Sequence, residues 1–238
     1  LTETLGECAF QNCKILTTAN MPIANSIGNN AFSGCSTLAT VNMPMANSIG
    51  NNAFFGCKAL TIASMPQATS IGHSVFNGCD ALITASMPKA TSIGDYTFFN
   101  CAALTTVNMP MATSIGSGAF SACYALTKVS MPKVTSIGNY GFSGCNALTT
   151  ASMPQATSIG SGAFYGCIAL QSLDISSVTK IEKLGTDYGS MFFPAFDNAT
   201  DPETFKNCDL LLNSALKQYC YDLSLIHISE PTRHSLIS

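Results

Sequence analysis

The chain has 238 residues, of which 47% are hydrophobic and only 10% are charged, and its formal net charge is −3. Ordinary globular domains carry roughly 25% charged residues, and here Ser, Thr and Asn fill the difference. With no basic stripe and no apolar run near the roughly 20 residues of a membrane-spanning helix, we expect neither nucleic-acid binding nor a membrane span.

A 22-residue repeat dominates the sequence, and each copy carries the pattern Phe-x-x-Cys-x-x-Leu. Self-similarity at one short period is the signature of a solenoid, in which equal turns stack along an axis. We therefore predict that like residues form columns inside the stack. The predicted structural core includes Phe54, Cys57, Leu60, Phe98, Cys101 and Leu104.

Residues 1–183 are assigned to this solenoid, which begins in mid-repeat because Leu5 aligns with Ile27 one period later. In a representative unit, residues 104–123, the pattern L-x-x-V-x-M alternates apolar and polar positions and predicts a short, half-buried strand. Pro110 ends this strand, because proline cannot donate to a ladder. We expect one or two parallel strands in every turn.

A glycine such as Gly116 recurs after the Ser-Ile pair, where we expect a corner with a backbone angle that other residues avoid. The Ala-Phe-x-x-Cys segment then closes the turn, and its expected form is one tight helical turn. Longer helices do not fit, because each period contains proline and glycine. The predicted class is mainly β: a right-handed solenoid of parallel strands with an irregular C-terminal cap.

The chain contains eleven cysteines, eight of which occupy the same position in successive repeats. A buried free cysteine behaves as a small apolar residue, and this is our interpretation of the column. Disulfides along the column are a second interpretation. A zinc site is disfavoured, since no C-x2–4-C pair occurs and histidine is scarce. We predict neither a metal site nor a cofactor. Whether Cys8, Cys208 and Cys220 are free or bridged stays open.

The pattern decays after Leu170, and we assign residues 184–222 to an inserted loop, a last irregular repeat and a capping helix. Residues 223–233 resemble the translation of a transposon-derived sequencing adapter. We therefore interpret residues 223–238 as a disordered artefact. The chain is interpreted as a fragment, with any signal peptide, anchor or further domain outside it.

The unit L-x-x-V-x-M-P-x-A-T-S-I-G-x-x-A-F-x-x-C-x-x-L resembles the BspA-like, or treponemal-type, leucine-rich repeats from Leu5 to about Ile181. This resemblance implies a leucine-rich-repeat solenoid. It also implies a secreted or cell-surface protein, since several members of that family are implicated in adhesion to host matrix proteins or to other cells. The family carries no shared catalytic residues.

The repeats also lack recognisable catalytic machinery. His73 is the one histidine before residue 223, and we interpret it as a solvated loop residue. Neither a G-x-S-x-G nucleophile elbow nor a phosphate-binding loop occurs. We therefore predict that the chain is not an enzyme.

Two surfaces are candidates for ligand binding. Outward strand positions form polar columns, and extended solenoid faces commonly bind proteins. An aromatic edge patch is the second candidate, because aromatic residues are enriched in interface cores, although these rings could equally pack across the edge of the stack. The candidate strand residues are Thr40, Asn42, Thr84, Ser86, Thr106, Asn108, Lys128 and Ser130, and the edge residues are Phe55, Tyr96, Phe99 and Tyr140.

The leading interpretation is an extracellular adhesion or recognition module that binds a protein, or a glycan, on the extended face. Its partner would be a host matrix protein or another cell surface. The strand face could also be hydrated without any ligand, in a passive spacer for a domain outside this fragment. Ice binding is a third alternative, which the interruptions at Ile62 and Lys128 disfavour.

Overall fold

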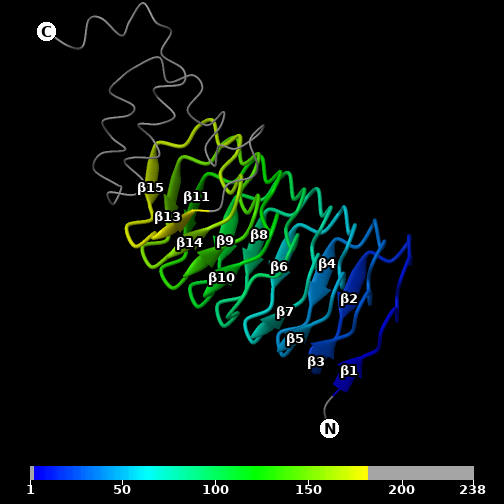
Figure 1. The fold of residues 1–238 in the computed structure, drawn as a ribbon. Helices are drawn as coiled ribbons and strands as arrows, with labels where there is room; N and C mark the ends of the chain where they lie inside the picture. Colours follow the sequence, from blue (N-terminus) through cyan, green and yellow to red (C-terminus); the bar gives the residue numbers. More distant parts are fainter. Residues whose placement is uncertain (1–2, 182–238) are drawn as a thin grey trace, which may run out of the picture.

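The computed structural model describes residues 3–181; the assigned regions 184–222 and 223–238 lie outside the described residues. The described chain winds into coils that step along one axis (Figure 1). It consists of strands and turns, without a helix between residues 3 and 181. The prediction of a mainly β solenoid with parallel strands and 22-residue turns is confirmed.

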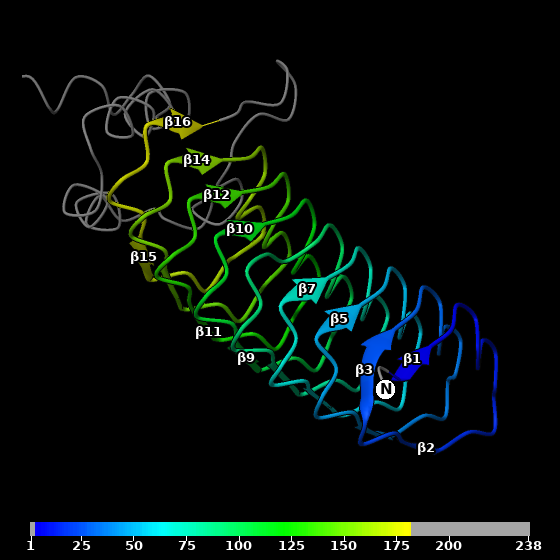
Figure 2. The ribbon, with the colours of Figure 1, turned by 90° about the horizontal axis from the view of Figure 1, so that it is seen from below.

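Two columns of parallel strands, here called ladders, run along the stack, and each coil contributes one strand to each, except that an isolated bridge from Ile93 to Ile115 replaces one strand. Strand pairing is interrupted along both, so the first ladder consists of three hydrogen-bonded sheets and the second of two. Paired residues lie 22 positions apart, apart from an irregularity at the first strand. The first ladder, here called the strand face, comprises β2 (Thr18–Asn20), β4 (Thr40–Asn42), β6 (Ile62–Ser64), β8 (Thr84–Ser86), β9 (Thr106–Asn108), β11 (Lys128–Ser130), β13 (Thr150–Ser152) and β15 (Ser172–Asp174). The second ladder, seen in Figure 2, comprises β1 (Glu3–Leu5), β3 (Ala24–Ile27), β5 (Ser48–Ile49), β7 (Ser70–Ile71), β10 (Ser114–Ile115), β12 (Ser136–Ile137), β14 (Ser158–Ile159) and β16 (Lys180–Ile181).

The Met-Pro pair that follows seven of the eight strands of the first ladder forms a reverse turn. The amide of Ala112 donates to the carbonyl of Met109 at 3.2 Å, which places Pro110 at the second position of the turn. Proline suits that position because its ring presets the required backbone angle. The prediction that proline follows the strand is thus consistent with the structure, and the same residue also turns the chain toward the second ladder.

The segment that carries Ala-Phe-x-x-Cys forms two successive reverse turns, so the prediction of a tight helical turn is wrong. Asn30 and Gly34 have φ of 55° and 76°, in the left-handed region that a right-handed helical turn excludes. The backbone amides of Asn30, Phe32 and Gly34 instead donate to backbone carbonyl groups of the next coil, at 2.7–2.8 Å. These bonds add a third connection between coils.

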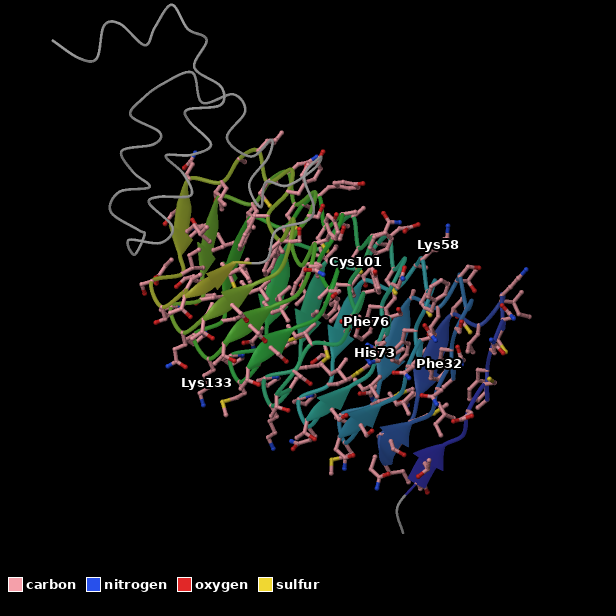
Figure 3. The ribbon with its side chains drawn as sticks, viewed as in Figure 1. Phe32, Lys58, His73, Phe76, Cys101 and Lys133 are labelled. Carbon is pink, nitrogen blue, oxygen red and sulfur yellow. The ribbon has the colours of Figure 1, made fainter. Side chains whose placement is uncertain are left out.

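Like side chains stack inside the coils. Successive phenylalanine rings lie 5.2–5.4 Å apart between centroids and within 10° of parallel. Figure 3 shows Phe32, Phe76 and Cys101 within the ribbon, while Lys58 and Lys133 project from opposite sides. The predicted core residues Phe54, Cys57, Leu60, Phe98, Cys101 and Leu104 all have no exposed surface.

The cysteine column does more than fill apolar space. Each buried thiol donates to the carbonyl of a phenylalanine in the preceding coil, as Cys57 does to Phe32 at 3.2 Å and Cys101 to Phe76 at 3.1 Å. All nine cysteines described in residues 3–181 are free. The sequence interpretation of free buried cysteines is confirmed for seven of the eight column residues, whereas Cys13 in the first coil is only half-buried. The hydrogen bond explains why Cys, rather than Ala, recurs there.

Each corner glycine is required by space rather than by backbone angle, so the prediction of an unfavourable angle is wrong. Gly116 does not lie in the left-handed region. A Cβ atom placed on it would lie 2.6 Å from the amide nitrogen of Asp95 and 2.6 Å from the carbonyl carbon of Gly94 in the preceding coil. Real Cβ atoms do not approach backbone so closely, so only glycine allows the coils to meet at the corner.

We predict that Gly116→Ala lowers the free energy of unfolding by about 3 kcal/mol or more, because the coils must separate at the corner. The matched control is Gly56→Ala. A Cβ there meets no atom within 4 Å, and Ala122 occupies the equivalent position of another coil with a similar positive φ. The control therefore costs only about 1–2 kcal/mol of backbone strain. Urea denaturation measures both, and equal losses would contradict the spatial explanation.

The thiol column also predicts how stability depends on pH. Burial raises the pKa of Cys57 and Cys123 from the ordinary value of 9.0 to about 12. The unfolded chain loses these protons near pH 9 while the folded chain keeps them, so stability is fully present below pH 9 and is lost as pH rises toward 12.

We expect the free energy of unfolding, measured in reductant, to fall between pH 9 and pH 11 with a slope of up to about 1.4 kcal/mol per pH unit for each buried thiol. Cys57→Ala should show a shallower slope than the parent, because it lacks one of these thiols. Identical slopes for the two proteins would show that the thiol at position 57 does not contribute.

Candidate binding surfaces

The strand face presents regular columns of polar side chains. In β11, Lys128 and Ser130 are exposed and flank the buried Val129, and the other strands of this ladder follow the same alternation. The parallel register then aligns Thr84 with Thr106 and Ser86 with Asn108. All eight predicted strand-face residues therefore lie on one face: Thr40, Asn42, Thr106, Asn108, Lys128 and Ser130 are exposed, and Thr84 and Ser86 are partly exposed.

Some polar groups of this face are already paired with each other. Asn42 donates its side-chain amide to Asn20 at 2.8 Å, and Asn108 donates to the hydroxyl of Ser86 at 3.2 Å. In contrast, the side chains of Thr40 and Lys128 make no hydrogen bond within residues 3–181. The strand face thus retains groups that are free to bind a ligand.

Two exposed isoleucines, Ile62 in β6 of the strand face and Ile83 just before β8, were not among the predicted binding residues. Ile62 lies opposite Thr84 in the ladder, and Ile83 directly precedes Thr84. These two isoleucines are 56% and 47% exposed. Their signal in the sequence is an aliphatic residue at a position where sister repeats carry threonine, such as Thr106 for Ile62 and Thr105 for Ile83.

The threonines directly before the strands of the second ladder use their hydroxyl groups within the stack. The hydroxyl of Thr113 donates to the carbonyl of Thr91 at 2.9 Å, and that of Thr135 donates to the carbonyl of Thr113 at 3.1 Å. The corresponding amides donate to the same carbonyls, both at 2.8 Å. These threonines therefore help to hold the coils together, whereas the hydroxyl groups of Ser114, Ser136 and Ser158 in the strands themselves make no hydrogen bond within residues 3–181.

His73 belongs to a hydrogen-bond ladder at the corner, so its interpretation as a solvated loop residue is incomplete. Its ring Nδ1 accepts the backbone amide of Asp95 at 3.1 Å, and its own amide donates to the side chain of Asn51 at 2.8 Å. The Asp95 carboxylate in turn accepts the amide of Ser117 at 2.7 Å. These side chains satisfy backbone donors, and Nδ1 of His73 also lies 3.5 Å from a carboxylate oxygen of Asp95.

The predicted aromatic edge patch lies along the segment with the two reverse turns. Phe55, Tyr96, Phe99 and Tyr140 are all between 36% and 48% exposed. Tyr96 and Phe99 contact each other edge to face, with centroids 5.9 Å apart. The rings are thus partly packed on the stack and partly available, which combines both interpretations made from the sequence.

Residues 3–181 contain no group of three or more His, Cys, Asp or Glu side chains arranged to hold a metal ion. No helix in this part of the chain is long and apolar enough to cross a membrane.

Comparison with known proteins identifies the repeat. The model of the BspA-type leucine-rich repeat region matches residues 3–123, 69–188 and 113–230. Among solved structures, a leucine-rich cell surface protein of Faecalibacterium prausnitzii is 27% identical, with a TM-score of 0.51, over 75% of this chain and 65% of its own. The leucine-rich repeat protein of T. pallidum is 26% identical, with a TM-score of 0.55, over 61% of this chain and 71% of its own.

A leucine-rich repeat protein of Eubacterium ventriosum is 28% identical, with a TM-score of 0.60, over 75% of this chain and 48% of its own. The chain thus spans less than two thirds of the F. prausnitzii and E. ventriosum chains. The curated proteins include no significant match. The repeat model nevertheless covers well over half of the sequence, and the chain therefore belongs to the BspA-type leucine-rich repeat family.

Proposed function

We propose that this chain is a non-catalytic recognition module of a secreted or cell-surface protein, and that it binds a protein ligand on its strand face. The observation that carries the proposal is the parallel register of the first ladder, which aligns outward side chains of eight coils on one face. Membership of a family of bacterial surface-type repeat proteins supports an extracellular role in protein interaction.

The chemistry of the strand face suits a protein partner. Protein interfaces combine a buried apolar core with a polar rim that forms hydrogen bonds. The half-exposed Ile62 and Ile83 supply apolar surface in the middle of the face, and Thr40 and Lys128 supply free polar groups around it. We propose adhesion to an extracellular matrix protein or to another cell surface as the biological role.

A passive spacer is the second candidate, and the paired side chains of the strand face favour it. Asn20 with Asn42, and Ser86 with Asn108, satisfy each other without any ligand. A spacer needs only a stable stack, whereas a recognition module also needs the exposed isoleucines. Substitution of those isoleucines therefore separates the two functions.

We predict that immobilised chain captures a component of solubilised extracellular matrix, and that the double variant Ile62→Glu with Ile83→Glu reduces this capture at least about tenfold. The reason is that two buried charges without partners replace the apolar centre of the interface. Surface plasmon resonance measures the capture, and circular dichroism checks that the variant folds.

The matched control is Ile23→Glu, which changes an exposed isoleucine outside the strand face. It should leave capture unchanged. Failure of the parent chain to capture any matrix component would favour the spacer. Equal loss in the control and the double variant would show that binding does not use the strand face.

A further inference from the structure

Tyrosine and glycine alternate along the aromatic edge. Two residues after the corner glycine, four successive coils carry Tyr96, Gly118, Tyr140 and Gly162. A Cβ atom placed on Gly118 would lie 2.6 Å from Cε1 of Tyr96, and one on Gly162 would lie 2.6 Å from Cε1 of Tyr140. Each ring therefore lies over the glycine of the following coil, which fixes the ring while leaving nearly half of it exposed.

This alternation sets the spacing of the two rings. Tyr96 and Tyr140 stand two coils apart, which is about 10 Å at the roughly 4.8 Å spacing of neighbouring strands. The neighbouring phenylalanine column has a similar step, since Phe98, Phe120 and Phe142 follow each other at 5.2 Å. A polyproline II chain rises about 9 Å over its three-residue turn. Two residues one turn apart on such a chain can therefore face the two rings together.

The polar groups of the edge select among extended ligands. The hydroxyl groups of Tyr96 and Tyr140 make no hydrogen bond within residues 3–181, so they can donate to a ligand. Polyproline II has no internal hydrogen bonds and keeps its carbonyl groups free to accept. By contrast, the side-chain oxygens of Asp95 and Asn139 already accept backbone amides of the next coil.

We propose that the aromatic edge binds a proline-rich protein segment in the polyproline II conformation, with Tyr96 and Tyr140 as anchors and Phe99 beside Tyr96. Aromatic surfaces recognise such segments because the ligand is already ordered and loses little entropy on binding. The inference rests on the proposed function, because it names the chemistry of one protein segment that the module recognises. It adds a second surface to the strand face.

Fluorescence anisotropy with a labelled oligoproline peptide tests the inference. The double variant Tyr96→Asn with Tyr140→Asn should weaken binding about 100-fold, and each single variant about tenfold. Asparagine suits these positions because Asn30 and Asn52 stand at the equivalent place with the same positive φ. The double variant Tyr96→Phe with Tyr140→Phe keeps the rings and should lose less affinity than the asparagine pair. Ser74→Asn, at the equivalent position of a coil without a ring there, is the control and should bind as the parent does.

The inference is overturned if the parent does not bind oligoproline, or if the asparagine pair binds it equally well. It is also overturned if linear β-1,4-linked oligosaccharides bind in a tyrosine-dependent manner while oligoproline does not. The parent chain could also capture matrix in a way that depends on Ile62 and Ile83 without binding oligoproline. That result overturns this inference and leaves the proposed function standing. Loss of both kinds of binding in the parent overturns both.

Discussion

Every coil depends on its neighbours to satisfy its buried backbone and to cover its side chains. The two strand ladders and the turn segment donate hydrogen bonds between coils, and the thiol of Cys101 adds one more to Phe76. The faces of a ring such as Phe98 are covered by the rings of the coils before and after it. Because one 22-residue turn has too little apolar surface to offset the entropy of ordering it, stability belongs to the array rather than to any single repeat.

The sequence predicts the columns well because the period and the apolar character of Phe, Cys and Leu can be seen without coordinates. It also places the corner glycine correctly, but it cannot show that Gly116 is needed for its 2.6 Å approach to the previous coil, since no distance between coils is written in the sequence. Positive φ at Tyr96 and Tyr140 could not be predicted from the sequence either, because large aromatic residues rarely adopt this backbone angle. The roles of His73 and the cysteine thiols required the positions of backbone groups 22 to 25 residues away.

Hydrogen bonds between coils already use some of the polar side chains. The hydroxyl of Thr113 donates to a backbone carbonyl of the preceding coil, and the Asp95 carboxylate accepts a backbone amide of the next coil, so both groups support the stack. The strand face and the aromatic edge combine free polar groups with exposed apolar surface, and this combination supports both proposed interfaces. The eight strand-face residues and the interruption at Ile62 could be placed on one surface from the sequence, whereas the exposed fractions of Ile62 and Ile83 and the contact of each tyrosine with a glycine required the structure.

The central claim is that the coils hold each other in a register of 22 residues, and a pair of internal deletions tests it most directly. Removal of residues 95–116 takes out one full period and joins Gly94 to Ser117, which restores the corner sequence. The account predicts that this protein keeps a β-type circular dichroism spectrum and a cooperative urea transition. Removal of residues 95–105 takes out half a period and should abolish the transition. Equal tolerance of both deletions, or equal collapse, would contradict the account.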